Sequence, residues 1–70
     1  MKFKKIVIVG LGLMGGSLAA ACRKAFPKTL ISGVTRNRRA LARALRERWI
    51  DEGTGNVAFG ASEADLIVLC

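Results

Sequence analysis

The chain has 70 residues, of which 51% are hydrophobic and 24% charged, and its formal net charge is +7. This is the composition of a globular protein, and the lack of histidine excludes histidine-based acid–base chemistry from these residues. Cys22 and Cys70 are not spaced as metal ligands, so we expect buried thiols in a reducing compartment. We expect no membrane-spanning segment, because charges interrupt every apolar stretch beyond Cys22.

The basic charge raises the question of nucleic-acid binding. It is concentrated in one short segment that contains six arginines, Arg36, Arg38, Arg39, Arg43, Arg46 and Arg48. No aromatic residues are interleaved with these arginines to stack on bases, and Trp49 is the only aromatic residue nearby. We therefore expect no nucleic-acid partner.

The apolar run from Ile6 to Ala21 follows a lysine-rich start and has two interpretations. A positive start, an apolar middle and small residues before Cys22 are typical of a secretory signal, and LAAAC is close to a lipoprotein cleavage pattern. In the second interpretation, the β-branched residues 6–9 belong to a strand that is buried on both faces, spanning about residues 3–9. A helix over about residues 13–25 then follows.

Three glycines decide between these interpretations. Gly10, Gly12 and Gly15 have the order G-x-G-x-x-G, directly after the expected strand and at the start of the expected helix. Strand, glycine turn and helix together form the dinucleotide-binding fingerprint. Gly10 permits the tight turn, Gly12 lets the backbone approach a pyrophosphate, and Gly15 lets the helix pack close to the strand. The sequence therefore favours a cofactor-binding turn over a signal peptide.

The next elements follow from helix and strand signals. Pro27 ends the first helix, and LISGV at residues 30–34 predicts a second strand. Asn37 is expected to cap a second helix over about residues 38–48. An apolar stripe facing the sheet is predicted at four-residue spacing, formed by Leu41, Leu45 and Trp49.

The last third of the chain ends in a strand. Gly53 and Gly55 indicate a loop, residues 56–64 suit either a short helix or irregular structure, and residues 66–69 form the third expected strand. The order β-α-β-α-β requires parallel strands and right-handed crossovers, with the expected strand order 3-2-1. We therefore predict the α/β class and the N-terminal half of a Rossmann domain, doubly wound around a parallel sheet. We expect residues 1–70 to be a partial NAD(P)-binding domain, because a complete one has about 150 residues.

The end of the second predicted strand selects between NAD and NADP. An acidic residue there binds the ribose hydroxyls of NAD, whereas arginine favours the 2′-phosphate of NADP. This chain has Thr35 and Arg36 there, and no Asp or Glu up to Arg46. Thr35 can donate to a phosphate oxygen, and Arg36 can stack beside adenine or bind the phosphate. Arg38 and Arg39 begin the next helix, where a bound phosphate would offset their repulsion by the helix dipole. NADP is the predicted cofactor.

The glycine turn, VGLGLMGGSLA at residues 9–19, resembles that of the prephenate and arogenate dehydrogenases of tyrosine biosynthesis. Its distinctive part is Gly15-Gly16-Ser17-Leu18, since the related β-hydroxyacid dehydrogenases share G-L-G-x-M-G but lack G-S-L. The resemblance extends to ISGVTRN at residues 31–37, WIDEGTGN at 49–56 and ASEADLIVLC at 61–70, and so covers essentially the whole chain.

The resemblance implies an oxidative decarboxylation of prephenate or arogenate, in which the substrate ring loses hydride to the nicotinamide and releases carbon dioxide. It assigns cofactor binding to Gly10, Gly12 and Gly15, to the backbone N–H groups of Leu13 and Met14, and to Thr35 and Arg36. NAD-using family members have Asp at the position of Thr35. The family's catalytic histidine and its dimerising helical domain have no counterpart in these residues.

The resemblance further implies a cytoplasmic enzyme that is a homodimer and acts on a small molecule. Two other functions suit the same turn. One is another NADP-dependent dehydrogenase, of the β-hydroxyacid dehydrogenase or imine reductase type. The other is a non-catalytic domain that senses NADP and regulates a partner.

Overall fold

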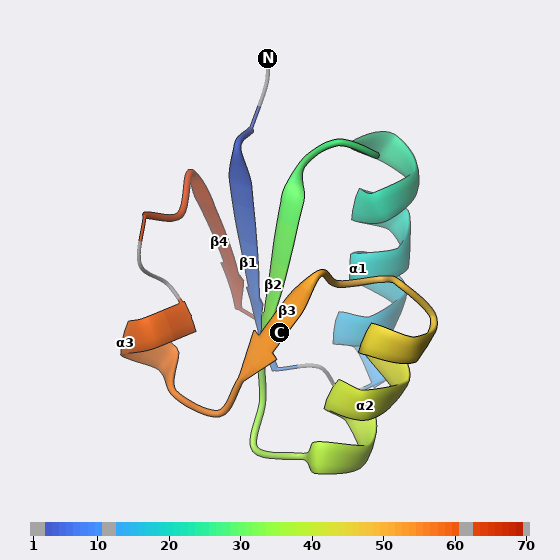
Figure 1. Cartoon of the computed structure of the whole chain (residues 1–70), viewed down its shortest axis with the longest axis vertical. Helices are drawn as coiled ribbons and strands as arrows, with labels where there is room; N and C mark the ends of the chain where they lie inside the picture. The colour runs from blue at the N-terminus through green and yellow to red at the C-terminus, as the bar shows by residue number, and fades with distance from the viewer. Residues whose placement is uncertain (1–2, 11–12, 61–62, 70) are drawn as a thin grey trace.

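The computed structural model describes residues 3–10, 13–60 and 63–69, without the side chains of residues 13–15 and 59. Its centre is a parallel sheet of four strands, β1 (Lys5–Val9), β2 (Leu30–Val34), β3 (Glu52–Thr54) and β4 (Leu66–Leu69). Their order across the sheet is β3-β2-β1-β4 (Figure 1). The α/β class and the parallel sheet are as predicted.

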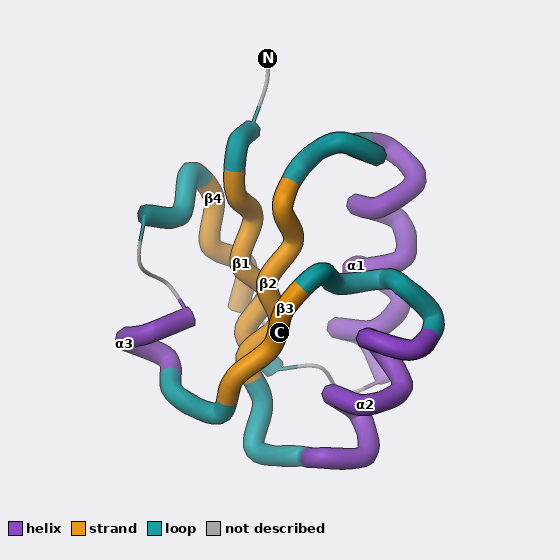
Figure 2. The backbone as a smooth tube through the Cα atoms, in the orientation of Figure 1, coloured by secondary structure: helices purple, strands orange, loops and turns teal. Residues whose placement is uncertain are grey.

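Helices cover the sheet from both sides. Helices α1 (Leu13–Ala25) and α2 (Arg38–Arg46) lie on one face, and the short α3 (Val57–Gly60) lies on the other (Figures 1 and 2). The bounds of α1 and β2 agree with the sequence prediction. Of the stretch 56–64, for which a short helix and irregular structure were both left open, residues 57–60 form the short helix α3 and residues 63–64 are irregular.

The strand order corrects the expected 3-2-1 arrangement. The strand predicted as the third, β4, pairs with β1 on the side opposite β2, with Val7 beside Ile67. The place next to β2 belongs to β3, where Gly53 pairs with Gly33. The sequence analysis assigned Gly53 to a loop because three residues with a central glycine carry no strand signal. Consequently β1 is an interior strand, and β3 and β4 are the edges of the described sheet.

Gly53 has a packing role in β3. A Cβ atom at this position would collide with the Leu41 side chain on α2. Glycine therefore lets α2 lie directly on the strand, which is a recognised use of glycine in strands.

The middle of strand β1 is fully buried, as the β-branched run predicted. Ile6, Val7 and Ile8 have no exposed surface. The apolar run that also suited a signal peptide is thus divided between this central strand and α1. The core beneath α1 and α2 consists of Ile6, Ile8, Ala19, Ile31, Ala44 and Ile50. In the described part of the chain, no helix is long and apolar enough to cross a membrane.

Helix α2 ends two residues before the predicted position 48. Arg48 has a φ of 61°, in the left-handed region where a helix cannot continue. The N–H of Trp49 donates to Ala44 at 2.9 Å and that of Arg48 to Leu45 at 3.1 Å, which is a Schellman helix end with arginine at the usual glycine position. The predicted apolar stripe is wrong at Leu45, which is 41% exposed, because Ala44 occupies the buried position instead.

Cys22 is half-buried and packs against the core cluster. Burial raises the pKa of its thiol, so the neutral form is favoured at physiological pH. This agrees with the predicted packing role rather than a reactive one. Cys70 lies outside the described residues.

Arg23 connects the end of α1 to the segments around it. Its guanidinium pairs with Asp51 at 2.6 Å, and its Nε donates to the Arg48 carbonyl at 3.0 Å. A further nitrogen donates to the carbonyls of Pro27 and Thr29. The Asp51 carboxylate also accepts the N–H of Ile31 at 2.8 Å. The Arg23 side chain thus ties α1 to the residues just before β2 and β3 and to the end of α2.

Replacing Arg23 with alanine is expected to lower the free energy of unfolding by about 2 kcal/mol, because several charge-assisted hydrogen bonds are lost together. Denaturant unfolding measures the change. Arg46→Ala is the control, since it removes the same charge from an exposed position on α2. If both variants lose the same free energy of unfolding, the removal of charge accounts for the effect and the Arg23 contacts do not.

Candidate functional site

A groove lies at the carboxyl ends of β1, β2 and β3, with a volume of about 530 Å³. Three segments line it, namely the end of β1, the end of β2 and the connection from β3 into α3. The lining residues are Val9, Gly10, Val34, Thr35, Arg36, Gly55, Asn56, Val57 and Ala58. Ligands of open α/β sheets bind beyond the carboxyl ends of strands, so the groove lies where this fold class places its ligand.

Gly10 has the geometry that the glycine fingerprint requires. Its φ is 89°, a conformation that side-chain-bearing residues avoid, and its N–H donates to the Val34 carbonyl at 2.7 Å. This bond continues the pairing of β1 with β2 by one residue beyond the strand. The chain then turns into α1, whose first residue is Leu13.

The predicted fingerprint residues beyond Gly10 are described in part. Gly12 lies outside the described residues. Leu13, Met14 and Gly15 form the start of α1, so their N–H groups belong to the set that lacks intrahelical partners at a helix N-terminus. Their side chains are not described, and the assignment of all four residues to cofactor binding stays a prediction.

Thr35 is held at the rim of the groove by backbone contacts. Its N–H donates to the Thr54 carbonyl at 3.0 Å, and its Oγ1 accepts the N–H of Asn37 at 3.1 Å. Because Oγ1 already accepts this bond, the hydroxyl proton is suited to donate to a ligand. The groove therefore has a hydrogen-bond donor where an acidic residue would supply only acceptors.

Asn37 caps α2 as predicted. Its side-chain oxygen accepts the N–H groups of Arg39 at 3.0 Å and Ala40 at 3.1 Å. The cap sets the direction in which the chain leaves Thr35, and hence the position of Arg36 beside the groove.

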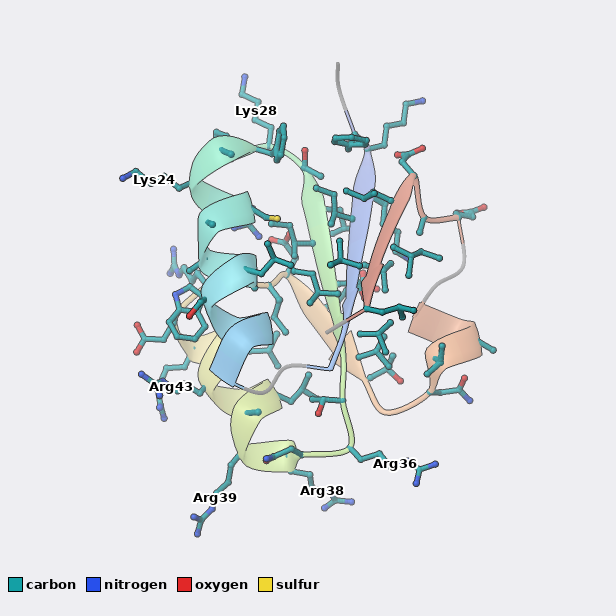
Figure 3. All side chains as sticks on the ribbon, turned by 180° about the vertical axis from the view of Figure 1, so that it is seen from behind. Lys24, Lys28, Arg36, Arg38, Arg39 and Arg43 are labelled. Atoms are coloured by element: carbon teal, nitrogen blue, oxygen red, sulfur yellow. The ribbon has the colours of Figure 1, made fainter. Side chains whose placement is uncertain are left out.

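The three arginines that were predicted to bind the cofactor differ in whether they line the groove. Arg36, Arg38 and Arg39 are exposed and extend from the same end of the molecule, where β2 leads into α2 (Figure 3). Arg36 lines the groove, whereas Arg38 and Arg39 do not. The lining residues that the structure describes include this one cation and no carboxylate, so this part of the groove is electrostatically suited to an anionic group.

Residues 55–58 form the third wall of the groove, which was not predicted from the sequence. Asn56 is held in a turn in which its N–H donates to the Thr54 hydroxyl at 3.1 Å and its carbonyl accepts the N–H of Gly60. These residues reach the groove because β3 lies next to β2. The glycine-asparagine pair indicated a turn, but no local signal placed that turn beside Thr35.

Known proteins were compared with the chain in sequence and in structure. No family model matches it. The prephenate dehydrogenase of Lactococcus lactis subsp. cremoris (strain MG1363) is 39% identical over 66 residues, which are 94% of this chain and 18% of that protein. The cyclohexadienyl dehydrogenase of Zymomonas mobilis subsp. mobilis (strain ATCC 31821 / ZM4 / CP4) is 35% identical over 68 residues, which are 97% of this chain and 23% of that protein.

Two solved structures share the fold. Prephenate dehydrogenase from A. aeolicus, in complex with hydroxyphenyl propionate and NAD+, superimposes with a TM-score of 0.86 and 33% identity. The match covers 99% of this chain and 24% of that one. Synechocystis arogenate dehydrogenase superimposes with a TM-score of 0.81 and 33% identity, and the match covers 94% of this chain and 23% of that one.

The chain is related to the N-terminal region of the prephenate and arogenate dehydrogenases. This confirms the family resemblance and the Rossmann-type fold inferred from the glycine turn. The chain spans between 18% and 24% of the length of these relatives. The A. aeolicus enzyme was solved with NAD+. The NADP preference of this chain stays a prediction.

Proposed function

We propose that this chain forms the first part of the cofactor-binding domain of a prephenate or arogenate dehydrogenase, an oxidoreductase that prefers NADP. Residues 1–70 then supply four strands of a larger doubly wound sheet. The exposed apolar side chains of the edge strand β4 support this, because Ile67 is 49% and Leu69 77% exposed. We propose that further strands of the complete protein cover them.

The groove at the strand ends is the observation that carries the proposal. It combines a positive-φ glycine at the end of β1 with a hydroxyl and a guanidinium at the end of β2, Thr35 and Arg36. These groups suit the adenosine end of a dinucleotide, whose pyrophosphate would face the N-terminus of α1. When bound, the nicotinamide cofactor supplies the hydride acceptor of the reaction.

The NADP preference rests on the donors and charges of the groove. Thr35 has a hydroxyl proton and Arg36 a guanidinium that can donate hydrogen bonds, and a 2′-phosphate offers acceptor oxygens and negative charge to both. The ribose hydroxyls of NAD are better served by a carboxylate, and the groove lining has none. Arg38 and Arg39 add positive charge near the same helix start without lining the groove.

These residues bind and orient, and the catalytic groups belong to other parts of the complete protein. We propose that the substrate is prephenate or arogenate, as the names of the relatives suggest. A homodimeric and cytoplasmic enzyme is the corresponding prediction for the complete protein.

Initial rates of reduced-cofactor formation test the proposal in the complete protein. Prephenate and arogenate are each assayed with NADP and with NAD. Turnover that is faster with NADP than with NAD on either substrate is the expected result. The substrate that is turned over faster distinguishes a prephenate dehydrogenase from an arogenate dehydrogenase. Turnover only with NAD would retain the family function and overturn the cofactor preference.

Two other results would point to the alternative functions. A protein that binds NADP and turns over neither substrate would be a different dehydrogenase or a sensor domain. Assays with small β-hydroxyacids and cyclic imines distinguish these two, because a sensor turns over none of them.

A further inference from the structure

Trp49, the only tryptophan of the chain, faces the start of α1, the helix that follows the glycine turn. Gly16 is the fourth residue of α1, and a Cβ atom placed on it would lie 3.4 Å from Cζ3 and 3.9 Å from Cε3 of the indole. The ring therefore faces Gly16 in the first turn of α1, at a separation that would just admit one methyl group. It also packs against the core cluster beneath the two helices.

The other contacts of Trp49 hold the ring in place. The Arg43 guanidinium on α2 lies over the indole, 5.4 Å from its centroid, which is a cation–π geometry. The Trp49 N–H closes the end of α2, and the preceding residue, Arg48, has its carbonyl bound by Arg23. Backbone and side chain are thus both restrained, and the ring provides a firm surface for α1.

We propose that Trp49 is a positioning residue for the cofactor site. By packing on Gly16 it sets how far the first turn of α1 lies from α2, and thereby aims the N–H groups of residues 13–15 at the cofactor pyrophosphate. This inference rests on the proposed function. Binding through helix N–H groups depends on their direction, and small displacements of binding groups have large effects on activity.

Trp49→Ala in the complete protein tests the inference. The expected result is an increase of about tenfold in the dissociation constant and KM for NADP, with the KM for the ring substrate unchanged. Trp49→Phe retains an aromatic surface against Gly16 and is expected to restore most of the affinity. If Trp49→Ala does not fold, Trp49→Leu replaces it, because leucine keeps apolar volume but lacks the flat ring. Its NADP affinity is then expected to be lower than that of Trp49→Phe.

Phe26→Ala is the control at the opposite end of the same helix. Phe26 packs edge-on against Phe3, with ring centroids 5.6 Å apart and an angle of 88°, so its loss weakens the fold away from the first turn of α1. NADP affinity that falls equally in Trp49→Ala and Phe26→Ala would overturn the positioning role. A wild-type protein that binds neither NADP nor NAD would instead overturn the proposed function.

Discussion

Replacing Arg36 with alanine is expected to raise the dissociation constant for NADP by roughly 10- to 100-fold and to leave that for NAD nearly unchanged. Hydrogen bonds to charged groups contribute about 1.5–3 kcal/mol, and the 2′-phosphate that would accept them is absent from NAD. Among the described residues that line the groove, Arg36 is the one cation, so none of the others replaces its charge. Calorimetric titration of the complete protein with each cofactor measures both constants.

The control for this prediction is Arg46→Ala, which removes one positive charge from the last residue of α2. It is expected to change the affinity for both cofactors only slightly, because Arg46 is exposed and does not line the groove, and exposed charges are screened by salt. Equal losses of NADP and NAD affinity in Arg36→Ala would contradict phosphate recognition and would favour stacking of Arg36 beside the adenine, which both cofactors share.

Replacing Gly60 with alanine is expected to destabilise the fold by about 2 kcal/mol, because overpacking a tight contact displaces the backbone. A Cβ at Gly60 would collide with Cγ2 of Val34 and lie 3.0 Å from Cγ2 of Thr54. Both neighbours are β-branched and have little rotamer freedom with which to make room. Helix α3 must therefore move away from the sheet.

Gly55→Ala is the matched control for the change at Gly60. A Cβ there would meet only the Thr35 carbonyl oxygen, at an ordinary contact distance of 3.7 Å. Thermal unfolding of both variants is the measurement, and only Gly60→Ala is expected to lower Tm. The same variant should weaken NADP binding, since Val57 and Ala58 of α3 form one wall of the groove. An unchanged Tm in Gly60→Ala would contradict the close packing of α3 on β2.

The elements that were predicted well depend on local signals. The β-branched run of β1, the glycine turn and Pro27 bound the first strand and helix, and the side chain of Asn37 caps α2 as its residue type suggested. Each of these signals acts between residues close in the chain. The part of the candidate site formed by Gly10, Thr35 and Arg36 could be predicted from the sequence for the same reason.

The remaining features required contacts between residues distant in the chain. The sequence alone determined a strand, a glycine turn, a helix and a non-acidic end to the second strand. Tertiary structure decided that β4 pairs with β1, that Gly53 belongs to a strand, and that residues 55–58 close the groove. The physical reason is that three-residue strands and short turns gain little from their own residues, so their place depends on which partners the rest of the sheet offers.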